Sequence, residues 1–125
     1  MTPAHTDWAR AMLGPGKILA PEQGVVLLDD PAAARRAARD HLAVYLPLEN
    51  YTNCWRRLGF GDADLADGGS DRLVDALVAW GDEEAVAARV RAHLAAGADH
   101  VPVQALGADP LAQLERIAPI LTALS

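Results

Sequence analysis

The five residues Gly24–Leu28 are apolar at every position rather than at alternate positions. An unbroken apolar run of this length predicts a β-strand that is covered on both faces. Such strands occur in parallel sheets, where helices connect one strand to the next. Asp30 and Pro31 follow the run and mark the start of a helix. The chain is therefore expected to be an α/β protein.

Start and stop signals, together with apolar residues three or four positions apart, predict four main helices. These helices are expected over residues 3–13, 31–46, 82–96 and 110–124. A second strand is expected over Val101–Leu106. Pro119 lies inside the last helix and should bend it, at a cost of about 3 kcal/mol if nothing compensates.

Residues 47–70 form an irregular insert between the expected elements. A short helix over Asn50–Leu58 is predicted there, followed by two stretches rich in glycine and aspartate. Ser70 is a suitable cap for a further helix. The run Leu73–Trp80 fits either a helix or a strand, because a short apolar run does not separate the two by its period.

Composition limits the classes of function. The chain has 125 residues, enough for one domain, and 51% of them are hydrophobic. Its formal net charge is −6 and no basic cluster is present, so nucleic acid and membrane are not expected as partners. The N-terminus lacks the pattern of a secretion signal, and no apolar run is long enough to cross a bilayer. The expected location is the cytoplasm.

The number of strands is small for the number of helices. Two clear strands and one ambiguous strand leave much of a parallel sheet uncovered. A complete (β/α)8 TIM barrel needs about 250 residues, so this chain has about half the required length. The strand count therefore predicts an incomplete portion of a barrel, which either pairs with another copy or another chain or has lost its N-terminal part.

Several stretches resemble the C-terminal part of luciferase-like oxidoreductases, and among them the actinobacterial group that uses the deazaflavin coenzyme F-420. The resemblance covers nearly the whole of residues 1–125. The stretches that carry it are Thr2–Thr6, Ala20–Arg35, Leu48–Tyr51, Leu58–Phe60, Gly69–Gly81 and Ala96–Val101.

This resemblance implies a (β/α)8 barrel of the bacterial luciferase superfamily that transfers a hydride, or acts as a monooxygenase, with coenzyme F-420 or FMN. In that family, the residues that face the cofactor ring come mainly from the N-terminal half. The resemblance therefore implies an oxidoreductase fragment that is not competent alone, and it assigns no catalytic or cofactor-binding residue to this chain.

Four residues are candidates for a pocket that binds a small-molecule substrate. Gln104 alternates along its strand with residues expected under the helices, so it is expected to face the barrel lumen. Asn50, Tyr51 and Arg56 lie in the insert, and loops of this kind often bind substrate. For all four residues, an ordinary packing or capping role is the alternative.

Metal binding and nucleophilic catalysis are not expected. His5, His41 and His93 lie in separate helices without the spacing of metal ligands. Cys54 is the only cysteine, and the sequence around it offers no clear base. His100 begins a strand and is expected to have a structural role.

Two other interpretations of the chain stay open. The first is a non-catalytic assembly module that dimerises through its open sheet edge. The second is an independent α/β domain that binds a small molecule.

Overall fold

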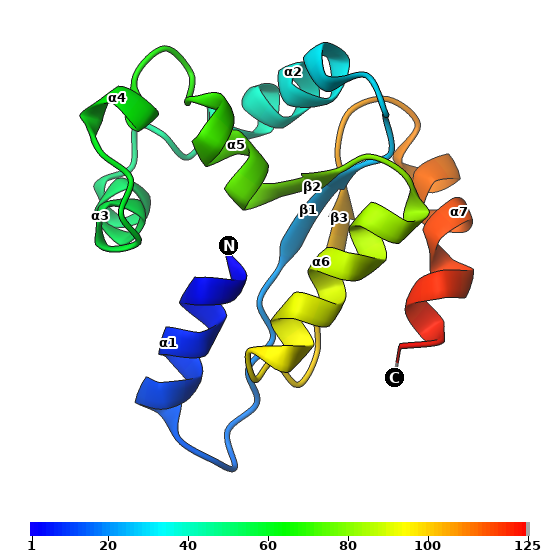
Figure 1. Cartoon of the computed structure of the whole chain (residues 1–125), viewed down its shortest axis with the longest axis horizontal. Coiled ribbons are helices and arrows are strands. Elements are labelled where there is room, and N and C mark those ends of the chain that lie inside the picture. Colours follow the sequence, from blue (N-terminus) through cyan, green and yellow to red (C-terminus); the bar gives the residue numbers. More distant parts are fainter. Residues whose placement is uncertain (125) are drawn as a thin grey trace.

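A computed structural model of the chain describes residues 1–124 (Figure 1). Seven helices and three strands are present in this part of the chain. The helices are α1 (Pro3–Leu13), α2 (Pro31–Leu42), α3 (Glu49–Arg57), α4 (Asp62–Leu65), α5 (Asp71–Leu77), α6 (Glu83–Ala95) and α7 (Pro110–Thr122), and the strands are β1 (Gln23–Val26), β2 (Val78–Trp80) and β3 (Val103–Ala105). The predicted α/β class is confirmed.

The three strands form one parallel sheet in the order β2-β1-β3. The central strand is β1, which pairs Gly24 with Val78 on one side and with Gln104 on the other. The expected parallel, fully covered strand is therefore present. Its continuous apolar sequence is explained by its central position, since Val25 and Val26 are buried on opposite faces.

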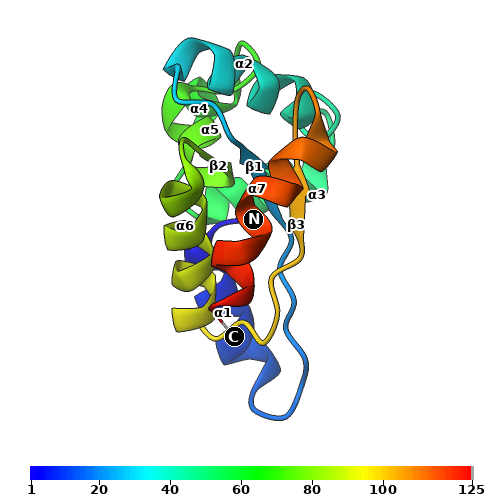
Figure 2. The ribbon, with the colours of Figure 1, turned by 90° about the vertical axis from the view of Figure 1, so that its right-hand side faces the viewer.

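Helices cover both faces of this sheet (Figures 1 and 2). On one face, Val26 and Val78 pack in a cluster with residues of α2, α3 and α5. On the other face, Val25 and Ala79 pack with residues of α6 and α7. Helix α1 packs against α6. The result is a three-layer arrangement with a very small sheet in the middle.

This arrangement differs from the predicted portion of a barrel. Three successive barrel strands would place β2 in the centre, and their helices would all lie on the outer face. Here the connection through α2 and α5 crosses one face, whereas α6 crosses the other face and carries the chain past β1 to β3. The described residues thus form an open sheet. Although the sheet has only three strands, helices bury both of its faces.

The run Leu73–Trp80, which fitted either a helix or a strand, is helical up to Leu77 and a strand from Val78 to Trp80. Ser70 caps α5 by accepting a hydrogen bond from the backbone N–H of Leu73. The helix ends at Leu77, and Val78 has the extended backbone of a strand (φ −123°, ψ 129°). Gly81 then has a φ of +127°, which favours glycine, and lets the chain turn into α6.

Most other boundaries lie within a few residues of the predicted ones. One exception is α2, which ends at Leu42 rather than at residue 46, and the following residues form turns that lead to Pro47. The predicted insert at 47–70 contains α3 and the one-turn helix α4. Pro119 does not interrupt α7. Among the described residues, no helix combines the length and the apolarity needed to cross a membrane.

A chain of buried polar side chains joins α1, α6 and β1. The Oγ1 atom of Thr6 lies 2.8 Å from Nδ1 of His93, and Nε2 of His93 lies 2.8 Å from Oε1 of Gln23. All three residues have no exposed surface. Gln23 also donates to the carbonyl of Leu77, so the chain of bonds extends to the start of β2. These bonds fix α1 and α6 against the amino-terminal end of the sheet.

Candidate functional site

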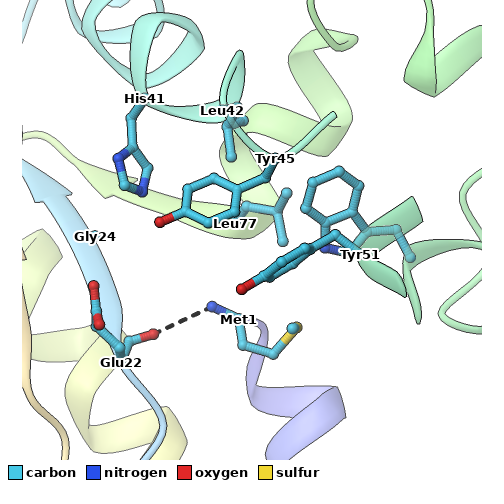
Figure 3. Close-up of a pocket in the computed structure, with 9 residues that line it drawn as sticks. Met1, Glu22, Gly24, His41, Leu42, Tyr45, Tyr51 and Leu77 are labelled. Carbon is cyan, nitrogen blue, oxygen red and sulfur yellow. Dashed lines mark hydrogen bonds between the residues drawn. The ribbon is translucent and has the colours of Figure 1, made fainter. Parts of the chain in front are cut away.

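A pocket of about 230 Å³ lies at the amino-terminal end of β1 (Figure 3). It is located on the face of the sheet that α2, α3 and α5 cover. The residues that line it are Met1, Glu22, Gly24, His41, Leu42, Tyr45, Tyr51, Trp55 and Leu77. The pocket therefore lies between the start of β1, the end of α2, α3, the end of α5 and Met1, which is two residues before α1.

Four rings form a continuous wall of this pocket. The ring centroids of Tyr45 and Tyr51 lie 4.8 Å apart in an edge-to-face arrangement. His41 lies 5.1 Å from Tyr45, and Trp55 lies 6.1 Å from Tyr51. Tyr51 and Trp55 are four residues apart on α3 and so lie on the same helical face. Because α2 ends at Leu42, Tyr45 lies in the turns that follow the helix, beside the ring of Tyr51.

The polar groups of the pocket differ in their surroundings. Burial lowers the pKa of His41 below its ordinary value, so the imidazole is neutral at pH 7. The hydroxyl groups of Tyr45 and Tyr51 point toward the side of the pocket where Glu22 and Met1 lie (Figure 3). No lysine or arginine is among the lining residues. The N-terminal amino group of Met1 also lies in the pocket, where it donates to the backbone carbonyl of Glu22 (3.2 Å), and burial lowers its pKa. The pocket is therefore mainly apolar, with hydroxyl, imidazole, carboxylate and amino groups at one side.

Trp55 carries a buried donor that has no partner. Its side chain is 2% exposed, and Nε1 makes no hydrogen bond within residues 1–124. An orphaned buried donor costs about 1–3 kcal/mol, and such groups are rare in folded proteins. The other two indoles are different, because Trp80 donates to Asp75 and Trp8 is 48% exposed.

The four residues predicted as pocket contacts do not form one site. Tyr51 lines the pocket described above. Asn50 precedes it on α3 and is exposed, and exposed Arg56 pairs with Asp62. Gln104 is exposed on β3, an edge strand of the open sheet. Its expected strand pattern is nevertheless present, since Val103 and Ala105 pack under α6 and α7.

A cysteine–histidine pair escaped the sequence analysis. Sγ of Cys54 lies 3.4 Å from Nδ1 of His5, although the two residues belong to α3 and α1. The pKa of His5 is lowered by burial and by nearby positive charge. No local sequence pattern connects two residues that lie 49 positions apart in the chain. Within the described chain, no carboxylate bonds to His5, and the thiol is 7% exposed, so the pair lacks the orientation and access of a nucleophilic centre.

At the carboxyl end of the sheet, the side chain of Gln113 bonds to the backbone. In parallel sheets where the strand order reverses, ligands bind outside the carboxyl ends of the strands at the reversal, here between β1 and β3. Gln113 of α7 accepts a hydrogen bond from the N–H of Leu27 (3.0 Å) and donates to the carbonyls of Leu106 (2.8 Å) and Ala108 (2.9 Å). The side chain of Gln113 thus bonds the backbone groups that a ligand would use there.

His93 is satisfied by protein groups and offers no ligand atom. The amide of Gln23 donates to the carbonyls of Gly24 and Leu77, so its oxygen is the acceptor that faces Nε2 of His93. Burial is the main cause that lowers the pKa of His93 to about 4. Across residues 1–124, no group of three or more histidine, cysteine, aspartate or glutamate residues is arranged to hold a metal ion.

No protein-family model, curated protein or solved structure matches the chain. Membership in the luciferase-like family is therefore a proposal, which rests on the chain's own residues.

Proposed function

We propose that the chain is the C-terminal portion of a luciferase-like oxidoreductase that uses coenzyme F-420 or FMN. The observation that carries the proposal is the position of the resembling stretches on the structural elements. Ala20–Arg35 contains β1 and the start of α2, Gly69–Gly81 contains α5 and β2, and Ala96–Val101 leads into β3. Each strand of the sheet is thus contained in, or follows directly from, one of these stretches.

In this proposal the chain supplies structural support rather than reacting groups. The described residues do not fit the cofactor by themselves. The pocket of about 230 Å³ is below the usual range of about 300–1,000 Å³ for ligand sites. At the carboxyl end of the sheet, Gln113 bonds to the free backbone groups. The residues that hold the cofactor and the substrate would therefore come from an N-terminal half.

The proposal has a consequence for the sheet. In a barrel, β2 would lie between β1 and β3. In the isolated chain, β3 pairs directly with β1. Assembly with an N-terminal half would therefore transfer β3 to the free edge of β2, and α6 would join the face that α2 covers.

The experiment is a reconstitution that monitors F-420 fluorescence. The isolated chain should not bind F-420. Co-expression with the N-terminal half of an F-420-dependent luciferase-like oxidoreductase should yield a complex that binds it. Failure of the two parts to associate, or tight binding of F-420 by the isolated chain, would contradict the proposal.

A second candidate is a non-catalytic module that dimerises through a sheet edge. The observation that favours it is that β2 and β3 each have one edge without a strand partner in the described residues. Exposed edges of this kind readily pair with another chain. Light scattering separates the candidates, because a folded monomer at high protein concentration excludes the dimerising module.

A further inference from the structure

We infer that Met1, His5 and Cys54 form a three-coordinate site for a monovalent copper ion, Cu(I). The ligand atoms are Sδ of Met1, Nδ1 of His5 and Sγ of Cys54. The inference needs neither the cofactor nor the N-terminal half of the oxidoreductase proposal, so it does not depend on that proposal.

Two electron-pair donors lie beside the thiol of Cys54, although they come from a distant part of the chain. Sγ of Cys54 lies 3.4 Å from Nδ1 of His5 and 4.0 Å from Sδ of Met1. Metal–sulfur bonds of about 2.3 Å and metal–nitrogen bonds of about 2.0 Å, with three ligands in one plane, give S–S and S–N separations of about 4.0 Å and about 3.7 Å. The two observed distances therefore fit ligands that share one metal ion.

Hydrogen bonding uses only part of this arrangement. A thiol has one proton, so Cys54 can donate to Met1 or to His5 but not to both. A metal ion would instead accept an electron pair from all three atoms. When the ion binds, Sγ of Cys54 releases its proton to solvent and forms the metal–sulfur bond as a thiolate.

The types of ligand determine which metal fits. Thiolate and thioether sulfurs are soft ligands that select Cu(I), and imidazole also suits copper. A zinc site would need a fourth ligand, usually cysteine, histidine or a carboxylate. Within residues 1–124, no group of three or more histidine, cysteine, aspartate or glutamate residues is arranged to hold a metal ion, so such a set is not present here. The ligands therefore favour Cu(I) over Zn(II).

The charges near the site favour a monovalent ion. Arg57 and the N-terminal ammonium act on the ring of His5, and Arg89 and Glu22 act on the ammonium. Of these four groups, only Glu22 is negative. Cu(I) and the thiolate of Cys54 together have no net charge, which limits the cost of burying them, whereas a divalent ion would add one positive charge to this surrounding.

An ion can reach the site through its two less buried ligands. Cys54 is 7% exposed, whereas Met1 and His5 are partly exposed. The amino group of Met1 donates to the carbonyl of Glu22, and the sulfur of Met1 lies on the side away from Glu22 (Figure 3). The amino group and the sulfur of Met1 therefore have separate partners.

The test titrates Cu(I), added as its acetonitrile complex, into the unaltered chain under reducing conditions without oxygen. Competition with the coloured chelator bicinchoninate measures the affinity, and one equivalent of Cu(I) should bind. The intact mass shows whether Met1 is present. A preparation without Met1 keeps two of the three ligands and should bind about 10–100-fold more weakly, since the loss of even an outer-shell partner of a metal site costs this much.

Substitutions identify the ligands. C54S replaces the thiol by a hydroxyl group and should abolish the binding of one equivalent of Cu(I). H5N should weaken binding by about 10–100-fold or more. H100N is the matched control, because His100 is exposed and is not one of the ligands, and it should not change the affinity.

X-ray absorption at the copper edge decides the question on the unaltered chain, even if a variant does not fold. The spectrum should show sulfur and nitrogen neighbours. Met12 is the only other methionine and is 70% exposed. In the M12L chain labelled with selenomethionine, Met1 therefore carries the only selenium, and copper should have a selenium neighbour.

Three results would overturn the inference. The first is failure of the chain that retains Met1 to bind one equivalent of Cu(I), and the second is equal affinity of C54S and the unaltered chain. The third is a copper spectrum without a selenium neighbour in the labelled M12L chain. None of these measurements uses F-420, so failure here leaves the oxidoreductase proposal standing, and failure of the reconstitution leaves this inference standing.

Discussion

Nε2 of His93 donates to Oε1 of Gln23 across 2.8 Å, between two side chains without exposed surface. The donor role follows from the amide, whose nitrogen already donates to two carbonyls. His93 is therefore neutral, with its proton on Nε2, and its Nδ1 accepts from Thr6.

The neutral state of His93 predicts a pH dependence of stability. The pKa is about 4 in the folded chain and about 6.5 in the unfolded chain, so the unfolded chain binds the extra proton first as the pH falls. The free energy of unfolding should therefore fall between pH 6.5 and 4, by about 3 kcal/mol in all. Urea unfolding at several pH values measures it. H93N should lose stability at pH 7 and show a flatter profile, and an unchanged profile would contradict the assignment.

The buried hydrogen bonds of Gln113 should contribute to the free energy of unfolding. Q113L leaves the N–H of Leu27 and the carbonyl of Leu106 without their partner, so it should destabilise the chain by about 2–3 kcal/mol. Q104L is the matched control on an exposed glutamine and should change stability by less than about 0.5 kcal/mol. Urea unfolding compares the two variants. Equal effects would mean that the bonds of Gln113 contribute little.

Asp64 should hold the insert together. Its carboxylate accepts from Arg72, from Ser70 (2.6 Å) and from the N–H of Gly61 (3.0 Å), and these bonds, first of all the one from Arg72, lower its pKa to about 2. Their contribution should be complete above pH 4 and lost as the pH falls toward 2. D64N should speed hydrogen exchange at Gly61, whereas D62N, at an exposed position, should not. Equal exchange rates in the two variants would refute this role.

Pro119 should lower the stability of α7. It is exposed inside a continuous helix, and it has no N–H to bond the carbonyl of Glu115. P119A should therefore raise the free energy of unfolding by about 1–3 kcal/mol. P110A is the control, since proline at the first helical position loses no bond. Thermal unfolding compares the variants, and a lower melting temperature for P119A would show that the ring of Pro119 is needed for packing.

Local signals in the sequence predicted the elements but not their order in the sheet. Caps such as Ser70 and Asp82 act on the next few residues, so they can be recognised from the sequence. The pairing of β3 with β1 depends on distant packing. A Cβ at Gly24 would lie 3.1 Å from Leu106 Cδ1, so the absence of a side chain at Gly24 makes room for the residue after β3. The residues around Gly24 in the sequence do not predict this contact with Leu106.

The pocket could be predicted only in part. The insert was expected to contribute, and Tyr51 does line the pocket. Trp55 lies one helical turn further, but its unpaired N–H depends on what surrounds it in space. Met1 and Leu77, which complete the lining, come from parts of the chain that no local pattern connects to α3.

The central position of β1 also governs how the chain must fold. Both partners of β1 lie more than fifty residues further along the chain, as the pairs Gly24–Val78 and Gln23–Val103 show. Neither pair can form by local hairpin closure, and each requires a long loop to close first. The helices can therefore form early, but the layers become fixed only when residues 78–105 reach β1. We expect this small domain to fold slowly for its length, over about milliseconds to seconds.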